Sequence, residues 1–209
     1  MININKLVTN SIVITTAPVD DGKTRVKYTA ASGHSDWEGD IVGELMYYLI
    51  PNRSDIAEVV IGSHVTSIGD STFEDCNGLT SVMIPGSVTS IGDSAFHNCT
   101  SLTSVTIPDS VTSIEYWAFY GCSSLMSVTI GNSVTSIGNQ AFYYCSSLTS
   151  ITIPDSVTNI DFLAFGLCDE LTSVTFSGKD MATVQGMTNY SWELPSGCTI
   201  HCTDGDITL

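Results

Sequence analysis

Apolar residues return to the same places along most of this chain, with a period of 23 residues. The stretch at residues 87–109, SVTSIGDSAFHNCTSLTSVTIPD, contains one full copy of the pattern. Five copies follow one another without a gap, as two columns of residues show: Val65, Val88, Val111, Val134 and Val157, and Phe73, Phe96, Phe119, Phe142 and Phe165. A period of about 20 to 50 residues is typical of a solenoid, in which stacked units bury a core that no single unit could form.

Each copy contains two extended pieces and a turn. Residues 102–107 alternate, so Val105 and Ile107 are expected to point into the core, while the Ser and Thr beside them point outward. Residues 88–91 form a second, shorter extended piece. Residues 93–98 can form a single helical turn, because Asp and Ser favour helix starts and Ala favours the helix. Stacked copies should therefore form a parallel sheet with an outer surface of Ser and Thr.

The period fails toward both ends, which divides the chain into three parts. Residues 55–178 are predicted to form the solenoid, with a partial repeat at Ile56, Val59 and Ile61 before the five full repeats. Residues 1–54 and 179–209 are predicted to be terminal caps, because the end coils of a solenoid must be covered.

The caps have local signals of their own. The N-terminal cap is expected to contain short strands plus a helix, because Ser35 and Glu38 form a capping-box pattern and Pro51 follows as a stop. In the C-terminal cap, residues 181–187 can form a short helix and residues 198–202 alternate like a final strand.

The pattern VTSIGxxAFxxCxxLTSVTIP resembles the leucine-rich repeat of BspA-like proteins, the treponemal-type class, over residues 56–176. The resemblance implies an α/β but mostly β solenoid, a right-handed superhelix with a concave parallel sheet. It also implies a role in binding other molecules at the surface of host-associated bacteria and some protists, and no catalytic residues. A secreted or cell-surface location follows from the resemblance alone. The chain shows no signal peptide, because polar residues interrupt its first segment, and no run of the roughly 20 apolar residues that a membrane span needs.

Five of the seven cysteines occupy one position of the repeat: Cys76, Cys99, Cys122, Cys145 and Cys168. Equivalent side chains in stacked coils point the same way, which is unfavourable for a disulfide, so we expect a buried column of thiols. Cys198 and Cys202 lie four apart in an extended segment, too far for a bridge. No zinc-ligand spacing is present, and no metal is expected.

The charge of the chain disfavours several classes of partner. The formal net charge is -16, and residues 54–178 contain no Lys or Arg. Such a surface repels phosphate groups, so nucleic-acid binding is not expected, and neither is docking to anionic lipid. Without a membrane span, direct membrane insertion is not expected either. We interpret the acidity as a solubility device more than as a cation site.

Candidate chemistry is sparse. A nucleophile elbow would need Gly-x-Ser-x-Gly, and the sequence around Ser94 has Phe96 at the last position. The four histidines are scattered, with no spacing typical of a metal site or a catalytic triad. Asp204 and Asp206 are better explained by a turn than by a calcium site. No catalytic residue and no cofactor are predicted, and an enzyme is disfavoured.

The repeats differ from one another around the Ala-Phe pair. These variable positions are polar in the first two copies, whereas in the later copies they become large apolar residues, including Leu163 and Leu167. We call the six aromatic members the aromatic edge: Tyr116, Trp117, Tyr120, Tyr143, Tyr144 and Phe162. Because equivalent positions stack, the edge is a candidate ligand-binding surface. The alternative is that these side chains pack over the turn or cover the C-terminal cap.

A second candidate surface is the outward face of the repeated strand, which we call the sheet face: Ser104, Thr106, Ser127, Thr129, Ser150 and Thr152. Its uniformity favours a structural explanation, since Thr suits a strand. The sequence therefore supports two hypotheses. The first is a non-enzymatic, adhesin-like or host-interacting protein that binds protein or glycan. The second is a structural, assembly or spacer component without a selective ligand.

Overall fold

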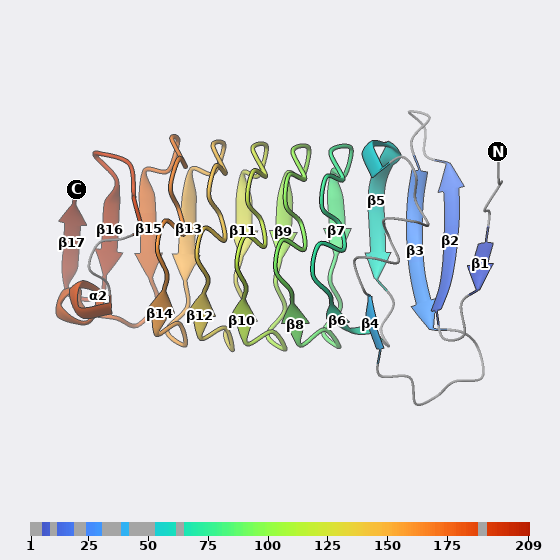
Figure 1. Cartoon of the computed structure of the whole chain (residues 1–209). Helices are drawn as coiled ribbons and strands as arrows, with labels where there is room; N and C mark the ends of the chain where they lie inside the picture. Colours follow the sequence, from blue (N-terminus) through green and yellow to red (C-terminus); the bar gives the residue numbers. More distant parts are fainter. Residues whose placement is uncertain are drawn as a thin grey trace.

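Two columns of parallel strands run along the stack of coils, as Figure 1 shows. The figure draws the computed structural model of the chain, in which residues 6–8, 12–18, 24–30, 39–41, 53–61, 65–187 and 192–209 are described. We number the five coils by their first valine: coil 1 begins at Val65, coil 2 at Val88, coil 3 at Val111, coil 4 at Val134 and coil 5 at Val157.

The first column lies on one side of every coil. It contains β5 (Ile56–Ile61), β7 (Ser81–Met83), β9 (Ser104–Thr106) and β11 (Ser127–Thr129), with β13 (Ser150–Ile153) and β15 (Ser173–Phe176) continuing the row. The register advances by one repeat per strand, so Ser127 pairs with Ser104 and Thr129 with Thr106. At the N-terminal end β3 (Thr24–Ala30) joins β5 in parallel, and β2 (Ile12–Pro18) and β1 (Lys6–Val8) extend the sheet in antiparallel order.

The second column consists of shorter strands. Its members are β4 (Gly39–Ile41), β6 (Val65–Ile68), β8 (Ser90–Ile91), β10 (Ser113–Ile114), β12 (Ser136–Ile137) and β14 (Asn159–Ile160), all parallel. The prediction of a mostly β, parallel solenoid with 23-residue repeats is thereby confirmed.

The core between the two columns consists of ladders of identical residues. The phenylalanines of the repeat are fully buried, and their rings stack from coil to coil with centroids 5.1 to 5.7 Å apart. The five repeat cysteines are buried beside them, and each thiol from Cys99 to Cys168 donates to the carbonyl of the phenylalanine in the preceding coil, as Cys122 does to Phe96 at 3.2 Å. Each coil thus completes its core only with its neighbours.

The segment after the second strand differs from the expectation. Residues 93–98 form consecutive turns, so the predicted helical turn is wrong. The amide of Ala95 bonds back to Gly92, at 3.3 Å, but the amide of Ser94 crosses to Tyr116 of the next coil, at 2.9 Å. Because alternate amides pair between coils, the backbone cannot follow the i to i−4 pattern that a helix requires.

The helix predicted in the N-terminal cap falls mostly on residues outside the described ones. Residues 39–41 form the strand β4, which pairs with β6 and extends the second column. The pairing edge of β6 therefore decides the structure of these three residues. Ser35, Glu38 and Pro51, on which that prediction rested, lie outside the described residues.

The C-terminal segment contains the expected short helix and final strand, α2 (Met181–Met187) and β16 (Thr199–Cys202), followed by the antiparallel β17 (Gly205–Thr208). Trp192 is only 3% exposed and packs against Phe176, with ring centroids 5.6 Å apart. Its carbonyl accepts the amide of Phe165 in place of a sixth coil. The last coil is therefore covered by this segment.

Two basic side chains hydrogen-bond to coils at opposite ends of the stack. Arg53, in the 3-10 helix η1 (Arg53–Asp55), donates from Nη1 to the carbonyl of Glu74 in coil 1. Lys179, which is buried, donates from Nζ to the carbonyl of Asp155, at 2.6 Å, and also contacts its carboxylate, at 3.3 Å. Both cations thus bind carbonyls of the repeat turns.

Candidate binding surfaces

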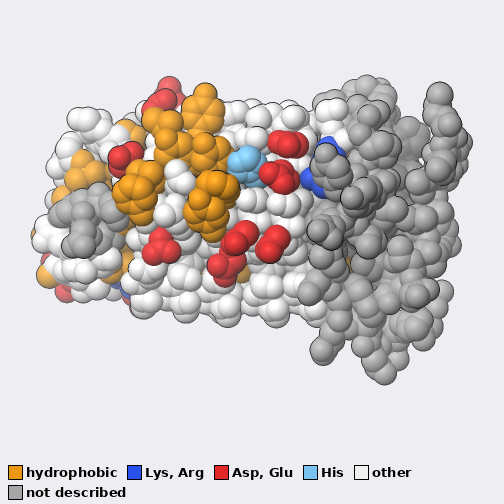
Figure 2. All heavy atoms as spheres, viewed as in Figure 1, with side chains coloured by type: hydrophobic (Ala, Val, Ile, Leu, Met, Phe, Trp, Pro, Cys, Tyr) orange, Lys and Arg blue, Asp and Glu red, His pale blue; other side chains and the backbone are white. Residues whose placement is uncertain are grey.

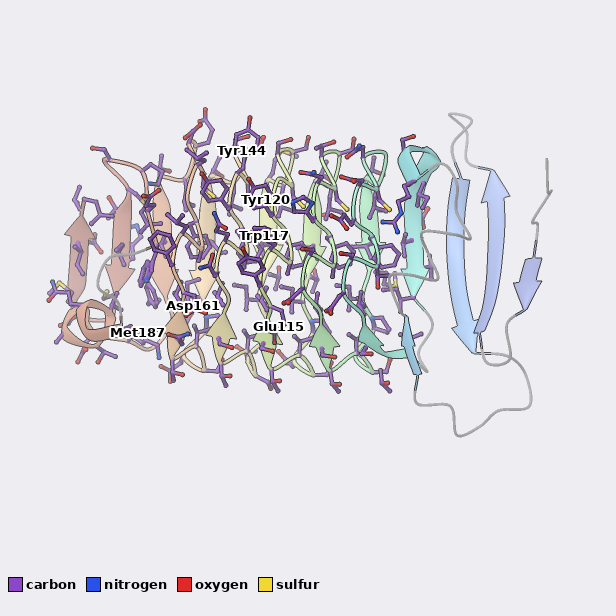
Figure 3. All side chains as sticks on the ribbon, viewed as in Figure 1. Glu115, Trp117, Tyr120, Tyr144, Asp161 and Met187 are labelled. Atoms are coloured by element: carbon purple, nitrogen blue, oxygen red, sulfur yellow. The ribbon has the colours of Figure 1, made fainter. Side chains whose placement is uncertain are left out.

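The aromatic edge follows the second column of strands, in the consecutive turns of coils 3 to 5. In coil 3 the ring of Tyr116 stacks on Trp117, with centroids 4.2 Å apart, and the Trp117 indole N–H donates to the side-chain oxygen of Gln140 at 2.6 Å. The rings of Trp117 and Tyr120 form a T-shaped pair with centroids 5.8 Å apart, and Figure 3 shows both side chains on this face of the solenoid. Neighbouring positions of one coil thus form a single cluster.

The cluster continues along the stack. Tyr120 lies between His97 of coil 2, at 4.9 Å between centroids, and Tyr143 of coil 4, at 5.2 Å. Beyond Tyr143 the equivalent residue is Gly166, where a Cβ would lie 2.7 Å from the Tyr143 ring. Only a glycine leaves room for the ring there. The structure therefore brings together four of the six predicted edge residues in direct ring contact.

Several large apolar side chains of the edge, and Leu167 beside it, are open to solvent. The exposed fractions are 37% for Tyr116, 48% for Tyr144, 54% for Phe162 and 46% for Leu167, while Trp117, Tyr120 and Tyr143 are half-buried. Figure 2 shows the resulting hydrophobic cluster, with acidic side chains around it. Exposed clusters of this kind mark interaction sites more often than isolated apolar residues do.

Two positions of every coil have a left-handed backbone, which the sequence did not reveal. At the first of these positions the φ angles are 51 to 57°, in Ser71, Ser94, Trp117, Gln140 and Leu163. At the second position they are 55 to 71°, in Asp75, Asn98, Gly121, Tyr144 and Leu167. This conformation costs an ordinary L-residue roughly 1–2 kcal/mol, whereas Asn, Asp and Gly tolerate it. The only available signal was the run of Asp, Asn and Gly at the second position in coils 1 to 3.

The left-handed positions of coils 3 to 5 lie in the edge or next to it. Trp117, Tyr144, Leu163 and Leu167 hold bulky side chains at positions where coils 1 and 2 have Ser, Asp or Asn. Strained residues persist where the surrounding structure imposes them, and they cluster at functional sites. Coils 3 to 5 thus combine two unfavourable features, an exposed apolar surface and an unfavourable backbone, in the same turns.

Carboxylates flank the aromatic side chains. The Glu115 carboxylate accepts a hydrogen bond from the hydroxyl of Ser113. The Asp161 carboxylate accepts one from the side-chain amide of Asn159, at 2.7 Å. Farther along, burial raises the pKa of Asp93, and the nearby carboxylates of Asp70 and Glu115 raise it further. The side of the edge toward coils 1 and 2 is therefore negatively charged.

The predicted sheet face is exposed as expected for its strands: Ser104, Thr106, Ser127, Thr129, Ser150 and Thr152 all point outward, while Val105, Val128 and Ile151 are buried. Two methionines interrupt its Ser and Thr rows, Met83 and Met126, with exposed fractions of 67% and 57%. The face is nearly uniform in chemistry, so it offers little basis for selectivity.

The repeat cysteines are structural. All seven cysteines are free thiols. Burial raises the pKa of Cys122 to about 12 and also raises the pKa values of the other four repeat thiols. A thiol of such high pKa forms little of the reactive thiolate, so these residues act as small apolar groups that donate one weak hydrogen bond.

Other groups carry no site among the described residues. His201 and Asp206 face each other across β16 and β17, 2.9 Å apart, as an exposed pair. Within the described part of the chain, no three His, Cys, Asp or Glu residues gather in a way that could hold a metal ion. Likewise, none of the described helices is long and apolar enough to cross a membrane.

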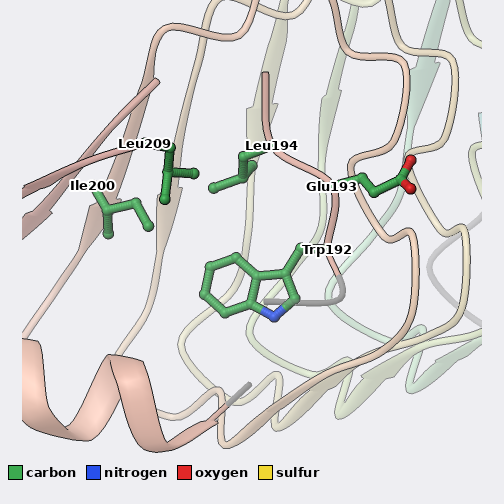
Figure 4. A pocket seen from close by; sticks show the side chains of 5 residues that line it. All are labelled: Trp192, Glu193, Leu194, Ile200 and Leu209. Atoms are coloured by element: carbon green, nitrogen blue, oxygen red, sulfur yellow. The ribbon is translucent and has the colours of Figure 1, made fainter. Parts of the chain in front are cut away.

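Figure 4 shows one hollow, at the C-terminal end of the solenoid. It measures about 240 Å³ and is lined by Trp192, Glu193, Leu194, Ile200 and Leu209. Ligand pockets usually measure about 300–1,000 Å³. The hollow is thus a packing gap of the covering segment, and the exposed faces of the solenoid remain the candidate surfaces.

Stacked 23-residue coils with a buried Phe and Cys ladder define a leucine-rich repeat solenoid. The family model described as "BspA type Leucine rich repeat region (6 copies)" matches residues 66–192. The chain belongs to this family, whose members are typically cell-surface proteins, and leucine-rich repeat proteins are generally non-enzymatic binding or scaffold proteins.

Solved structures agree with this assignment. A leucine-rich repeat protein of T. pallidum is 28% identical, with a TM-score of 0.56 over 78% of this chain and 68% of that one. A leucine-rich cell surface protein of Faecalibacterium prausnitzii is 27% identical, with a TM-score of 0.51 over 82% of this chain and 54% of that one. A Bacteroides ovatus protein, 21% identical with a TM-score of 0.53 over 93% of this chain and 55% of that one, shares the fold. The chain thus spans about two thirds of the first protein and about half of the other two, and no curated protein matches it.

Proposed function

We propose that this chain is a non-enzymatic binding protein, secreted or held at the cell surface, that recognises protein or glycan through the aromatic edge. An adhesin-like or host-interacting role fits the family's usual place at the cell surface. One observation carries the proposal: coils 3 to 5 place bulky side chains, the half-buried Trp117 and Leu163 and the exposed Tyr144 and Leu167, at left-handed positions that coils 1 and 2 fill with Ser, Asp or Asn. Selection for folding alone favours the smaller residues there.

The alternative of a packing role is less consistent with the burial of these residues. Trp192 covers the last coil and is 3% exposed, whereas Tyr144 and Phe162 expose about half of their surface. A side chain that served only to seal the end of the core would be expected to resemble Trp192. Large, rigid aromatic side chains instead resemble the anchors that contribute most of the energy at protein interfaces.

The test is a variant that replaces edge residues by those of other coils at the same position. Tyr116→Asn, Trp117→Ser and Tyr120→His together introduce the side chains of Asn139, Ser94 and His97, which the fold already accepts. Wild type and this edge variant are screened against arrays of glycans and purified extracellular matrix proteins. A matched variant, Ser127→Gln with Thr129→Gln, enlarges side chains on the sheet face.

We expect each ligand of the wild type to bind the edge variant at least about 30-fold more weakly, the loss typical of removing an interface hot spot. The sheet-face variant should bind like the wild type. Retained binding by the edge variant, with circular dichroism unchanged, would refute the edge as the site. Loss of binding in the sheet-face variant alone would transfer the function to that face.

The second candidate is a structural or spacer component without a selective ligand. It is favoured by the uniform Ser and Thr surface of the other side, which repeats through coils 2 to 4 without variation at the exposed strand positions. Light scattering and electron microscopy test it. Ordered self-assembly together with an empty ligand screen would favour this role over binding.

A further inference from the structure

The aromatic edge contains two acid–aromatic pairs at equivalent positions, two coils apart. Glu115 precedes Tyr116 in coil 3, and Asp161 precedes Phe162 in coil 5. All four side chains are exposed. The equivalent residues of coil 4 are Gly138 and Asn139, so these positions have neither charge nor apolar bulk in the coil between the two pairs. Figure 3 shows Glu115 and Asp161 with the aromatic side chains on this face.

Each carboxylate of these pairs is held by the side chain two residues before it. Ser113 donates to Glu115, and Asn159 donates to Asp161, from the same position of their coils. Neither carboxylate has a basic partner within the described residues. An oriented carboxylate that lacks a cation is available to bind one from a ligand, and an adjacent aromatic ring adds a cation–π contact.

The surrounding charge favours a cationic ligand. Asp70 and Asp93 continue the acidic surface toward coil 1, and residues 54–178 contain no Lys or Arg. The two described basic side chains, Arg53 and Lys179, donate to backbone carbonyls of the solenoid. A positively charged partner would therefore meet a complementary field, which raises its association rate and excludes anionic competitors.

The separation of the two pairs indicates the form of the ligand. Two steps of a parallel stack correspond to about 10 Å. A polyproline II helix advances about 9 Å in three residues and returns to the same face after those three. In a β-strand, by contrast, residues three apart point to opposite faces. A polyproline II segment with cations three residues apart matches both acid–aromatic pairs.

We propose that the aromatic edge binds an extended, basic polypeptide segment in polyproline II conformation, with Arg or Lys at every third position, lying along the solenoid axis. This inference rests on the proposed function and specifies its partner. Aromatic-lined surfaces recognise polyproline II segments in other proteins because the ligand loses little entropy on binding. Here the two carboxylates fix the register.

A polypeptide fits the ring geometry better than a glycan does. A sugar ring would need an open ring face, but both faces of Tyr120 are covered, by His97 and Tyr143. Tyr116 and Trp117 cover each other. The side of Tyr143 away from Tyr120 lies against Gly166. The exposed aromatic side chains, Tyr116, Tyr144 and Phe162, come from three different coils, and such separate rings suit aliphatic stems and guanidinium groups.

The test uses fluorescein-labelled peptides and the whole chain. The probe is a Pro-Pro-Arg repeat of twelve residues. One control has the same composition with the arginines two and four residues apart, and another has Gln in place of Arg. Fluorescence anisotropy measures the dissociation constant at low and at high salt. Glu115→Gln with Asp161→Asn removes both carboxylates at nearly unchanged shape. Asp169→Asn with Glu170→Gln removes two other exposed charges from coil 5.

We expect the regular arginine peptide to bind most tightly, and its affinity to fall with salt. The Glu115→Gln, Asp161→Asn variant should bind it roughly tenfold more weakly, from about two- to fivefold per exposed ion pair. The control charge variant should stay within about twofold of the wild type. The irregular peptide should lose a similar factor, because it reaches only one pair at a time.

The other outcomes separate this inference from the proposed function. Equal binding of the Gln peptide, or no effect of the carboxylate variant, would overturn the basic partner and leave the aromatic edge as a site. A glycan that binds the wild type but not the edge variant, with no peptide bound, would do the same. Equal binding of the arginine peptide to the edge variant would overturn both.

Discussion

Gly131 of coil 3 lies close to the backbone of coil 2, which makes Gly131→Ala a test of how the two coils stack at this point. A Cβ at this position would lie 2.4 Å from the carbonyl oxygen of Pro108, 2.6 Å from its carbonyl carbon and 2.8 Å from the amide nitrogen of Asp109. These are backbone atoms, so no side-chain rotation can relieve the overlap. Gly86 is the matched control, because a Cβ there would meet nothing within 4 Å.

The two substitutions should change stability in opposite directions. Relief of the overlap at Gly131 requires the two coils to separate locally, at a cost of about 1–3 kcal/mol for overpacking. The separation would also weaken the bond from the Asn132 amide to the Asp109 carboxylate, now 2.6 Å, for about 1 kcal/mol more. The Gly86→Ala variant should gain about 0.4–1 kcal/mol, because alanine has less freedom to lose on folding.

Urea unfolding followed by circular dichroism measures both variants. We expect Gly131→Ala to lose about 2–4 kcal/mol and roughly 5–15 °C of melting temperature, and Gly86→Ala to gain a few degrees at most. Because each coil is stabilised by its neighbours, a weakened contact in the middle of the stack should also broaden the transition and lower its m-value. Equal stability of the two variants, or a loss below about 0.5 kcal/mol for Gly131→Ala, would refute the close backbone approach at Gly131.

Three further predictions concern the thiols and the C-terminal end. In the native protein at pH 8, iodoacetamide should modify the half-buried Cys202 well before the buried repeat cysteines, and early labelling of Cys122 by mass spectrometry would contradict the buried ladder. Because burial raises the pKa of Cys122 from 9.0 to about 12, the unfolded chain loses this proton first, so stability should fall as pH rises above about 9. The urea midpoint should therefore drop between pH 8 and pH 10.5, and the drop should be smaller in Cys122→Ala. Lys179→Met should cost about 1.5–3 kcal/mol, because it removes charge-assisted bonds to Asp155, whereas Asp155→Asn, which keeps the carbonyl contact, should cost less in thermal unfolding.

The core of the fold could be predicted from the sequence because it depends on periodicity alone. The Val and Phe residues that recur every 23 positions were predicted to face inward in every coil, and all of them are buried in the structure. The consecutive turns could not be predicted in the same way. Asp93 and Ser94 favour a helix start and Ala95 favours the helix, but the amide of Ser94 pairs with the carbonyl of Tyr116 in the next coil, and local propensity gives no sign of that contact. The strand at residues 39–41 has the same explanation, since β6 supplies its partner.

The candidate site was predictable in its membership and not in its geometry. Equivalent positions must stack, so the aromatic residues of coils 3 to 5 could be expected to lie together. Their left-handed backbone could not be read from Trp117 or Tyr144, because those residue types do not favour it. Nor could the sequence show that Ser113 and Asn159 hold two carboxylates in the same way, because those bonds depend on side-chain orientation.

The most direct measurement is the dissociation constant of the Pro-Pro-Arg peptide for the wild type and for the Tyr116→Asn, Trp117→Ser, Tyr120→His variant, at matched folding by circular dichroism. A partner that uses the aromatic edge should bind the variant at least about 30-fold more weakly. Equal dissociation constants for the two proteins would contradict the assignment of this edge as the binding surface.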